Sequence, residues 1–298
     1  MTLEPTIFPD AEALGSALGR EIADGIADAA RSGRRYILGC PGGRSPVTTY
    51  AALARLVADE RLDLSCVVIA MMDDYVRNGD GRFSPVPGDA HYSVARFAAE
   101  QISAPLSAAA GPGRGITADR VWSPDPAHPE GYDARLMEAG GVDLFILASG
   151  DSDGHVAFNP PGSPADSRTR IITLAESTRR DNLNTFPDFA SLDEVPQWGV
   201  SVGIATIVTA ARRAVLVAPG PSKRTTVARI AASGGYDPGW PATVLCACRH
   251  PSLFVDAAAV ELPATAVSAR PSDEHSDPLS RPEVPQGPHP ERIQRCRT

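Results

Sequence analysis

The side chains best suited to chemistry stand in three short polar clusters, each directly after an apolar run. The clusters are Gly42, Gly43, Arg44 and Ser45 in "PGGRSP", Asp73 and Asp74 in "MMDDY", and Asp153, Gly154 and His155 in "SDGHVAFN". If the apolar runs are parallel strands of one sheet, their carboxyl ends meet at one edge, where the sites of such folds gather. We therefore expect the three clusters to form a single site.

The loop at residues 41–46 is typical of an anion site. Its glycines let the backbone curl, the helix expected after it offers free N–H groups, and Ser45 adds a hydroxyl. No Gly-Lys-Ser/Thr follows, so the loop is not a Walker A motif. An ordinary strand-to-helix turn is the alternative, but the position beside the other clusters favours a phosphate site.

The two acidic clusters suit proton transfer. One carboxylate of the Asp73–Asp74 pair, at the end of an expected strand, can take a proton from a carbon next to a carbonyl. From the motif alone, a helix cap or turn stabiliser is an equally good interpretation. His155 can shuttle protons at neutral pH, although a lone histidine is more often structural. Because no second histidine or cysteine stands at ligand spacing, we expect no metal and no cofactor.

A second basic position is Lys223 in "APGPSK", between an expected strand and an expected helix. It is the only lysine among 28 basic residues. A composition that replaces lysine almost everywhere suggests that a compact ammonium is needed here, as for holding a phosphate. The alternatives are chance and a solvated surface lysine.

Apolar runs alternate with helical patterns along most of the chain. We expect strands at 35–40, 65–72, 142–149, 170–174, 214–219 and 253–260, and helices at 10–31, 47–60, 92–102 and 222–233. This alternation predicts a three-layer α/β fold with a mostly parallel sheet covered by helices on both faces.

The remaining segments set the expected domain limits. Residues 77–92, rich in Gly, Pro and Asp, are expected to be a loop. A single domain is expected over residues 1–261. Residues 262–298 carry seven prolines and almost no apolar period, so we expect a disordered or loosely attached tail.

Composition excludes several classes of protein. The net charge of −8 argues against nucleic acid as the main partner. No run of about 18 apolar residues predicts a membrane span, and the N-terminus does not resemble a signal peptide. The five cysteines form no even framework and are expected to be free thiols of a cytoplasmic protein. A homo-oligomer is compatible with the sequence but not indicated by it.

Taken together, the segments resemble the glucosamine-6-phosphate deaminase/isomerase family and, more distantly, the 6-phosphogluconolactonases. The matching segments, in the order of the family, are "LGCPGGRSPVTTYAAL", "MMDDYV", "DGHVAFN", "SRTRIITL", "VSVGIATI" and "GPSK". They run from about residue 36 to residue 256. The "AFN" after Asp-Gly-His and the "SRTRI" are more similar to the deaminase branch.

The resemblance implies a NagB/RpiA-like, Rossmann-like fold and a sugar phosphate as the small-molecule substrate. It implies that the 42–45 loop and Lys223 hold the phosphate. It implies that Asp73 moves a proton between C1 and C2 of the opened sugar. It also implies that His155 is the ring-opening acid/base, held by Asp153 and by a glutamate at the end of the motif.

The sequence departs from the family pattern near His155. The glutamate position is Pro160, which has neither a carboxylate nor an N–H group. An arginine that the deaminases carry over the phosphate is replaced by Asn184, whose uncharged amide cannot act as a bidentate guanidinium. Asp151 and Ser152 stand where the family has more glycine. Arg44, Arg179 or Arg180 are candidates for the missing positive charge, and Asp151 and Asp166 for the missing acid.

Three hypotheses follow, in decreasing order of preference. The first is an isomerase or deaminase acting on an amino sugar phosphate, with chemistry altered by the loss of the glutamate. The second is a lactonase-type hydrolase, because hydrolysis needs only one base to activate water. The third is a sugar-phosphate binding protein without catalytic activity, which both departures would favour.

Overall fold

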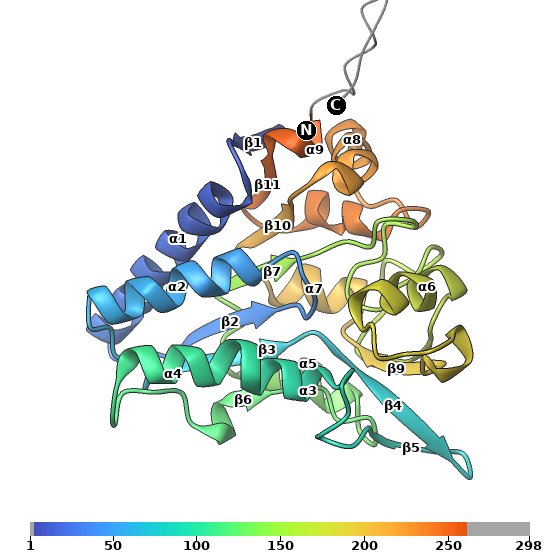
Figure 1. Cartoon of the computed structure of the whole chain (residues 1–298), viewed down its shortest axis with the longest axis horizontal. Coiled ribbons are helices and arrows are strands. Elements are labelled where there is room, and N and C mark those ends of the chain that lie inside the picture. Colours follow the sequence, from blue (N-terminus) through green and yellow to red (C-terminus); the bar gives the residue numbers. More distant parts are fainter. Residues whose placement is uncertain (1–2, 261–298) are drawn as a thin grey trace, which may run out of the picture. The chain divides into compact units, whose positions relative to one another are not determined.

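A seven-stranded parallel sheet forms the centre of the molecule. The computed structural model describes residues 3–260, and the expected tail at 262–298 lies outside the described residues (Figure 1). The strands, in their order across the sheet, are β1 (Pro5–Phe8), β11 (Pro251–Asp256), β10 (Ala214–Ala218), β7 (Leu144–Leu147), β2 (Tyr36–Cys40), β3 (Val67–Met71) and β6 (Val121–Trp122). Every neighbouring pair is parallel. The predicted α/β fold is confirmed.

Side chains of the central strands alternate between two hydrophobic cores, one on each face of the sheet. Leu144 and Ile146 of β7 belong to one core, whereas Phe145 and Leu147 belong to the other. This period of two is the geometry of a strand buried on both faces, and it explains why these strands read as continuous apolar runs.

Helices cover both faces, as Figure 1 shows. One core is closed by α1 (Ala11–Arg31), α2 (Val47–Asp59), the π-helical turn η1 (Ala98–Ser103) and α4 (Ala104–Ala110). The other is closed by α5 (Glu130–Glu138), α7 (Ile204–Ala210), α8 (Arg224–Ala232) and the 3₁₀ helix η5 (Pro241–Ala247). The helix expected at 10–31 begins at an N-cap, because the Asp10 carboxylate accepts a hydrogen bond from the Ala13 N–H at 2.8 Å.

A second, antiparallel sheet was not expected. Its strands, in order, are β5 (Arg82–Pro85), β4 (Asp73–Gly79), β9 (Trp198–Ser201) and β8 (Arg170–Thr173). The chain leaves the parallel sheet at Met72, whose carbonyl accepts a hydrogen bond from Val202 N–H at 2.8 Å. Asp73 therefore lies where the two sheets separate, paired in register with Ser201.

Two local predictions were wrong, and one predicted helix changes type along its length. Residues 77–92 are not a loop throughout, because β4 and β5 form a hairpin whose side chains are mostly exposed and therefore show no apolar pattern. Residues 253–260 are not one strand: β11 ends at Asp256, whose carboxylate accepts the Ala259 N–H, and α9 (Ala257–Val260) follows. The helix expected at 92–102 begins at Val94 and changes type: the short α3 (Val94–Phe97) runs directly into the π-helical turn η1 and then α4.

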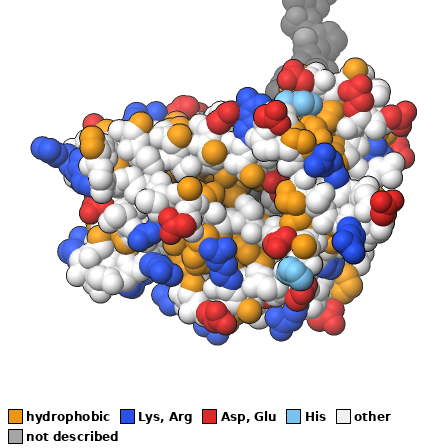
Figure 2. Space-filling view, turned by 90° about the horizontal axis from the view of Figure 1, so that it is seen from below, with side chains coloured by type: hydrophobic (Ala, Val, Ile, Leu, Met, Phe, Trp, Pro, Cys, Tyr) orange, Lys and Arg blue, Asp and Glu red, His pale blue; other side chains and the backbone are white. Residues whose placement is uncertain are grey.

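Three further findings concern the predicted class of the chain. Within residues 3–260, no helix is long and apolar enough to cross a membrane. The face shown in Figure 2 carries basic and acidic side chains interspersed around a hollow with hydrophobic side chains in it. Cys40 and Cys248 are buried free thiols, and Cys66 and Cys246 are half-buried free thiols.

Candidate active site

The three polar clusters and Lys223 meet in one pocket at the carboxyl edge of the parallel sheet. The lining includes Gly42, Gly43, Arg44, Ser45, Asp73, Ser149, Gly150, Asp151, His155, Asp181, Asn182, Thr185, Phe186 and Lys223. Strands β2, β3, β7 and β10 each end at this edge, so the topology brings together segments that are more than 100 residues apart in sequence. Of the three clusters and Lys223, only Asp74, Asp153 and Gly154 do not line the pocket.

The 41–46 loop forms one wall and leads into α2. Gly43 has φ 85°, a left-handed conformation that favours glycine. The Tyr50 hydroxyl donates a hydrogen bond to the Pro41 carbonyl at 3.0 Å and so fixes the start of the loop. Helix α2 has no side-chain cap at Pro46, which leaves first-turn N–H groups for an anion.

The two neighbouring aspartates of "MMDDY" have different surroundings. The Asp74 carboxylate accepts hydrogen bonds from the N–H groups of Tyr75 (2.8 Å), Val94 (3.0 Å) and Ala95 (3.0 Å), so it caps α3. Asp73 is 7% exposed and lines the pocket. Burial, with a further contribution from Asp74, raises the pKa of Asp73 to about 7. The cap interpretation therefore applies to Asp74, whereas Asp73 is suited to proton exchange near neutral pH.

Asp153 and His155 form a hydrogen-bonded pair. The distance between Asp153 Oδ1 and His155 Nδ1 is 2.7 Å, and the same oxygen accepts the His155 backbone N–H at 3.0 Å. The other oxygen accepts hydrogen bonds from the hydroxyls of Ser177 and Thr178, on α6 (Glu176–Thr185). Burial alone would raise the pKa of Asp153, but the hydrogen bonds and the charge of His155 hold it well below its usual value. With a proton on Nδ1, Nε2 is the nitrogen left to exchange protons.

Two glycines make this arrangement possible. A Cβ on Gly150 would collide with the imidazole of His155, and a Cβ on Gly154 would collide with the indole of Trp240. Gly154 also has φ 68°. The turn after β7 is therefore tight enough to place His155 against Asp153 only because both positions lack a side chain.

Lys223 lies at the pocket but is not a free cation. Its ammonium forms an ion pair with the Asp151 carboxylate and donates to the carbonyl of Ser149. Burial on its own would raise the pKa of Asp151. The nearby Lys223 ammonium, with a smaller contribution from Arg44, lowers this pKa by more, so it lies below its usual value. Asp151 was a candidate acid beside His155, but in the structure its carboxylate pairs with Lys223 instead.

The other candidate replacements lie outside the pocket lining. Asp166 is exposed. Arg179 donates to the carbonyls of Leu192 and Val195, and Arg180 pairs with Glu176 on the exposed face of α6. Of the three arginines considered, only Arg44 lines the pocket.

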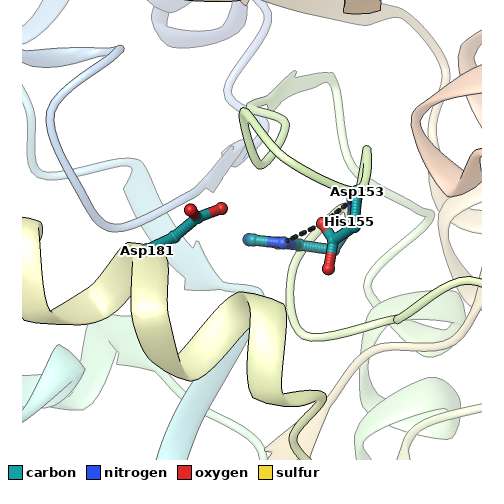
Figure 3. A group of neighbouring side chains, drawn as sticks. All are labelled: Asp153, His155 and Asp181. Atoms are coloured by element: carbon teal, nitrogen blue, oxygen red, sulfur yellow. Dashed lines mark hydrogen bonds and ion pairs between the residues drawn. The ribbon is translucent and has the colours of Figure 1, made fainter. Parts of the chain in front are cut away.

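The residue that sequence reasoning missed is Asp181 of α6. Its carboxylate points toward His155 (Figure 3), and one oxygen each of Asp181 and Asp153 and one nitrogen of His155 lie within 4.8 Å of one another. Such a trio could in principle hold a metal ion. However, the Nδ1 hydrogen bond and the Ser177 hydroxyl already engage His155 and Asp153, so a metal would have to displace existing partners.

A glycine loop, a buried acid and an Asp–His pair lie together at the carboxyl edge of a parallel sheet, where the active sites of α/β enzymes gather. The sequence model of the family described as "Glucosamine-6-phosphate isomerases/6-phosphogluconolactonase" matches residues 9–255. The chain belongs to this family.

Relatives and solved structures agree with this assignment. Glucosamine-6-phosphate deaminase of Streptomyces coelicolor is 36% identical over 263 residues, covering 86% of this chain and 91% of the relative. The Rhodococcus opacus deaminase is 34% identical, covering 82% and 88%. A monomeric glucosamine-6-phosphate deaminase of the NagB superfamily superposes with a TM-score of 0.71 at 25% identity, covering 87% and 98%. A 6-phosphogluconolactonase from Shewanella baltica (TM-score 0.62, 17% identity, 86% and 100%) shares the fold.

Proposed function

We propose that the protein converts glucosamine-6-phosphate and water into fructose-6-phosphate and ammonia. The observation that carries this proposal is the presence in one pocket of two proton-transfer groups, Asp73 and the His155–Asp153 pair. A reaction that opens a ring and then moves a proton between two carbons needs two such groups, whereas simple hydrolysis needs one.

The chemistry divides between these groups. His155 Nε2 takes the proton of the C1 hydroxyl and returns it to the ring oxygen as the C1–O5 bond breaks. Asp73, as carboxylate, takes the proton from C2 and delivers it to C1, while one proton of the amine passes to O1, which leaves an imine at C2 and a hydroxyl at C1. Addition of water to C2 and loss of ammonia complete the reaction, with no net change in oxidation state. Because the pKa of Asp73 is about 7, the carboxyl can both accept and return the proton near neutral pH.

The substrate phosphate would bind at the 42–45 loop. Backbone N–H groups, the Ser45 hydroxyl and the Arg44 guanidinium are the donors at this wall. Lys223 joins them once its ion pair with Asp151 is exchanged for the phosphate. This assignment follows from the family resemblance and from the shared pocket.

A product assay tests the proposal. Incubation of the purified protein with glucosamine-6-phosphate should release ammonia and fructose-6-phosphate in equal amounts. His155→Ala should abolish both, while an exposed histidine variant, His128→Ala, should match the wild type. Failure to detect either product at high enzyme concentration would contradict the deaminase proposal.

A second candidate function is hydrolysis of 6-phosphogluconolactone, favoured by Pro160, which leaves His155 without the glutamate of the deaminase pattern. Loss of the lactone no faster than in buffer would exclude it. Thermal stabilisation by phosphosugars without turnover of any of them would instead indicate the binding protein. A cytoplasmic location and a homo-oligomer stay predictions.

A further inference from the structure

Pro160 raises the question of which carboxylate, if any, accompanies Asp153 at His155. Pro160 does not line the pocket. Among the described residues that do line it, the acids are Asp73, Asp151 and Asp181. Asp151 is paired with Lys223, and the Asp73 carboxyl receives no hydrogen bond within residues 3–260. Asp181 is the acid whose carboxylate lies beside the imidazole.

Helix α6 carries two residues that act near His155, Ser177 and Asp181. Ser177, in its first turn, donates to Asp153 behind the imidazole. Asp181 is four residues further on, so it projects from the same face of the helix one turn later. From there its carboxylate points toward His155 (Figure 3), and one of its oxygens lies within 4.8 Å of an imidazole nitrogen and of an Asp153 oxygen. Helix α6 thus positions two carboxylates near the imidazole. It holds Asp153 through the Ser177 hydroxyl, and it carries Asp181 as one of its own residues.

Asp181 is also held in place. The Ser152 hydroxyl donates to its Oδ2 at 3.0 Å. Ser152 belongs to the same loop as Asp153 and His155, in which the sequence departs from the family pattern. The loop that lacks the glutamate therefore contributes the hydroxyl that fixes a different acid near His155.

We propose that Asp181 is a positioning residue for the proposed reaction, replacing the carboxylate that Pro160 cannot supply. It stabilises the imidazolium that forms when His155 Nε2 takes a proton from the sugar. Asp181 transfers no proton itself, so the ring-opening step keeps the balance given above. The other charged or titratable groups at the pocket are Asp73, Arg44, Lys223 and Asp151, of which the last two form an ion pair. The expected change in kcat rests on the proposed function, whereas the expected effect of Asp181 on His155 does not.

The test is Asp181→Asn, which keeps size and removes charge. Histidine NMR of the wild type and the variant at one pH, without any substrate, reports whether the Asp181 charge acts on the imidazole; we expect the ring-nitrogen signals of His155 to differ between the two proteins. In the ammonia assay, kcat should fall by about tenfold with KM unchanged, because the imidazolium loses a stabilising charge. Asp181→Glu should retain most of the activity.

The matched control is Asp188→Asn, an exposed acid just beyond α6 that does not line the pocket; it should leave both readouts unchanged. Unchanged ring-nitrogen signals of His155 in Asp181→Asn would overturn the proposal, whatever the activity of the wild type. Changed signals with unchanged kcat would also overturn it. Zn²⁺ binding that raises wild-type activity and is lost in Asp181→Asn would show a metal site instead. An inactive wild type would contradict the proposed function, but the NMR comparison would still show whether Asp181 acts on His155.

Discussion

Asp73 and Asp153 follow two strands of the same sheet edge and are almost equally buried, with exposed fractions of 7% and 8%. Their surroundings are nevertheless opposite. Asp153 accepts hydrogen bonds from His155, Ser177 and Thr178. Asp73 receives none from the described residues and faces the pocket beside a second carboxylate, Asp74. The pKa of Asp153 is held well below its usual value, and that of Asp73 rises to about 7.

The comparison shows that burial alone does not decide the charge of a carboxyl group. Burial disfavours the ionised form of both acids, but hydrogen bonds to the carboxylate reverse this only for Asp153. One acid therefore stays ionised and orients a histidine, while the other changes protonation state in the pH range of the reaction. Two residues of the same type thus take two roles in one pocket.

The largest expected effect comes from removing the titrating acid. Asp73→Asn should reduce kcat/KM for ammonia release by about 10³- to 10⁴-fold, because the amide cannot take the proton from C2. Steady-state kinetics on the purified variant measure the loss. The control is Asp80→Asn at the exposed tip of the β4–β5 hairpin. A loss of less than about tenfold would mean that Asp73 is not the base.

The same variant should change the pH dependence of stability. The folded-state pKa of Asp73 lies above the unfolded value of 3.8, so the folded protein binds the extra proton between about pH 4 and pH 7. The wild type should therefore lose stability as pH rises through this window. Asp73→Asn should not, and above pH 7 it should be more stable by up to about 4 kcal/mol. Urea unfolding from pH 4 to pH 8 tests this; parallel curves for the two proteins would refute the raised pKa.

Removing the ionised acid should cost activity by a different route. Asp153→Asn should lower kcat by about 10²- to 10³-fold, because the amide no longer fixes the Nδ1 proton or stabilises the imidazolium. Asp166→Asn is the matched control, since that acid is exposed and outside the pocket lining. If Asp153→Asn kept the activity of the wild type, the Asp–His pair would be structural.

The smallest effect concerns the phosphate wall. Asp151→Asn releases Lys223 from its ion pair, so inorganic phosphate should bind about three- to tenfold more tightly, measured by calorimetry at low salt. Asp188→Asn should leave the affinity unchanged. Weaker phosphate binding in Asp151→Asn would show that Asp151 positions the lysine rather than competing for it.

The sequence predicted the site best where polar residues directly follow a buried strand. Continuous apolar runs identified the central strands, and the polar residues at their ends identified the loop at 41–46, Asp73 and His155. The β4–β5 hairpin was missed because its exposed side chains show no apolar pattern. The partners Asp151 and Lys223 could not be assigned, because they are 72 residues apart and meet only through the sheet order.

Asp181 was missed for a related reason. Helix α6, "ESTRRDNLNT", is polar almost throughout, so it shows no apolar face that would predict a helix or its orientation. Without the helix, the four-residue spacing between Ser177 and Asp181 carries no meaning. The same holds for Asp74, whose capping role depends on a helix that begins 20 residues later.

Carbon-13 NMR of the aspartate carboxyl groups, titrated from pH 4 to pH 9, tests the contrast between the two acids most directly. Asp73→Asn and Asp153→Asn assign the two signals. The Asp73 signal should titrate with a midpoint at about pH 7, and the Asp153 signal should stay that of a carboxylate throughout. An Asp73 midpoint near the ordinary value of about 4, or titration of both groups together, would contradict the division of roles.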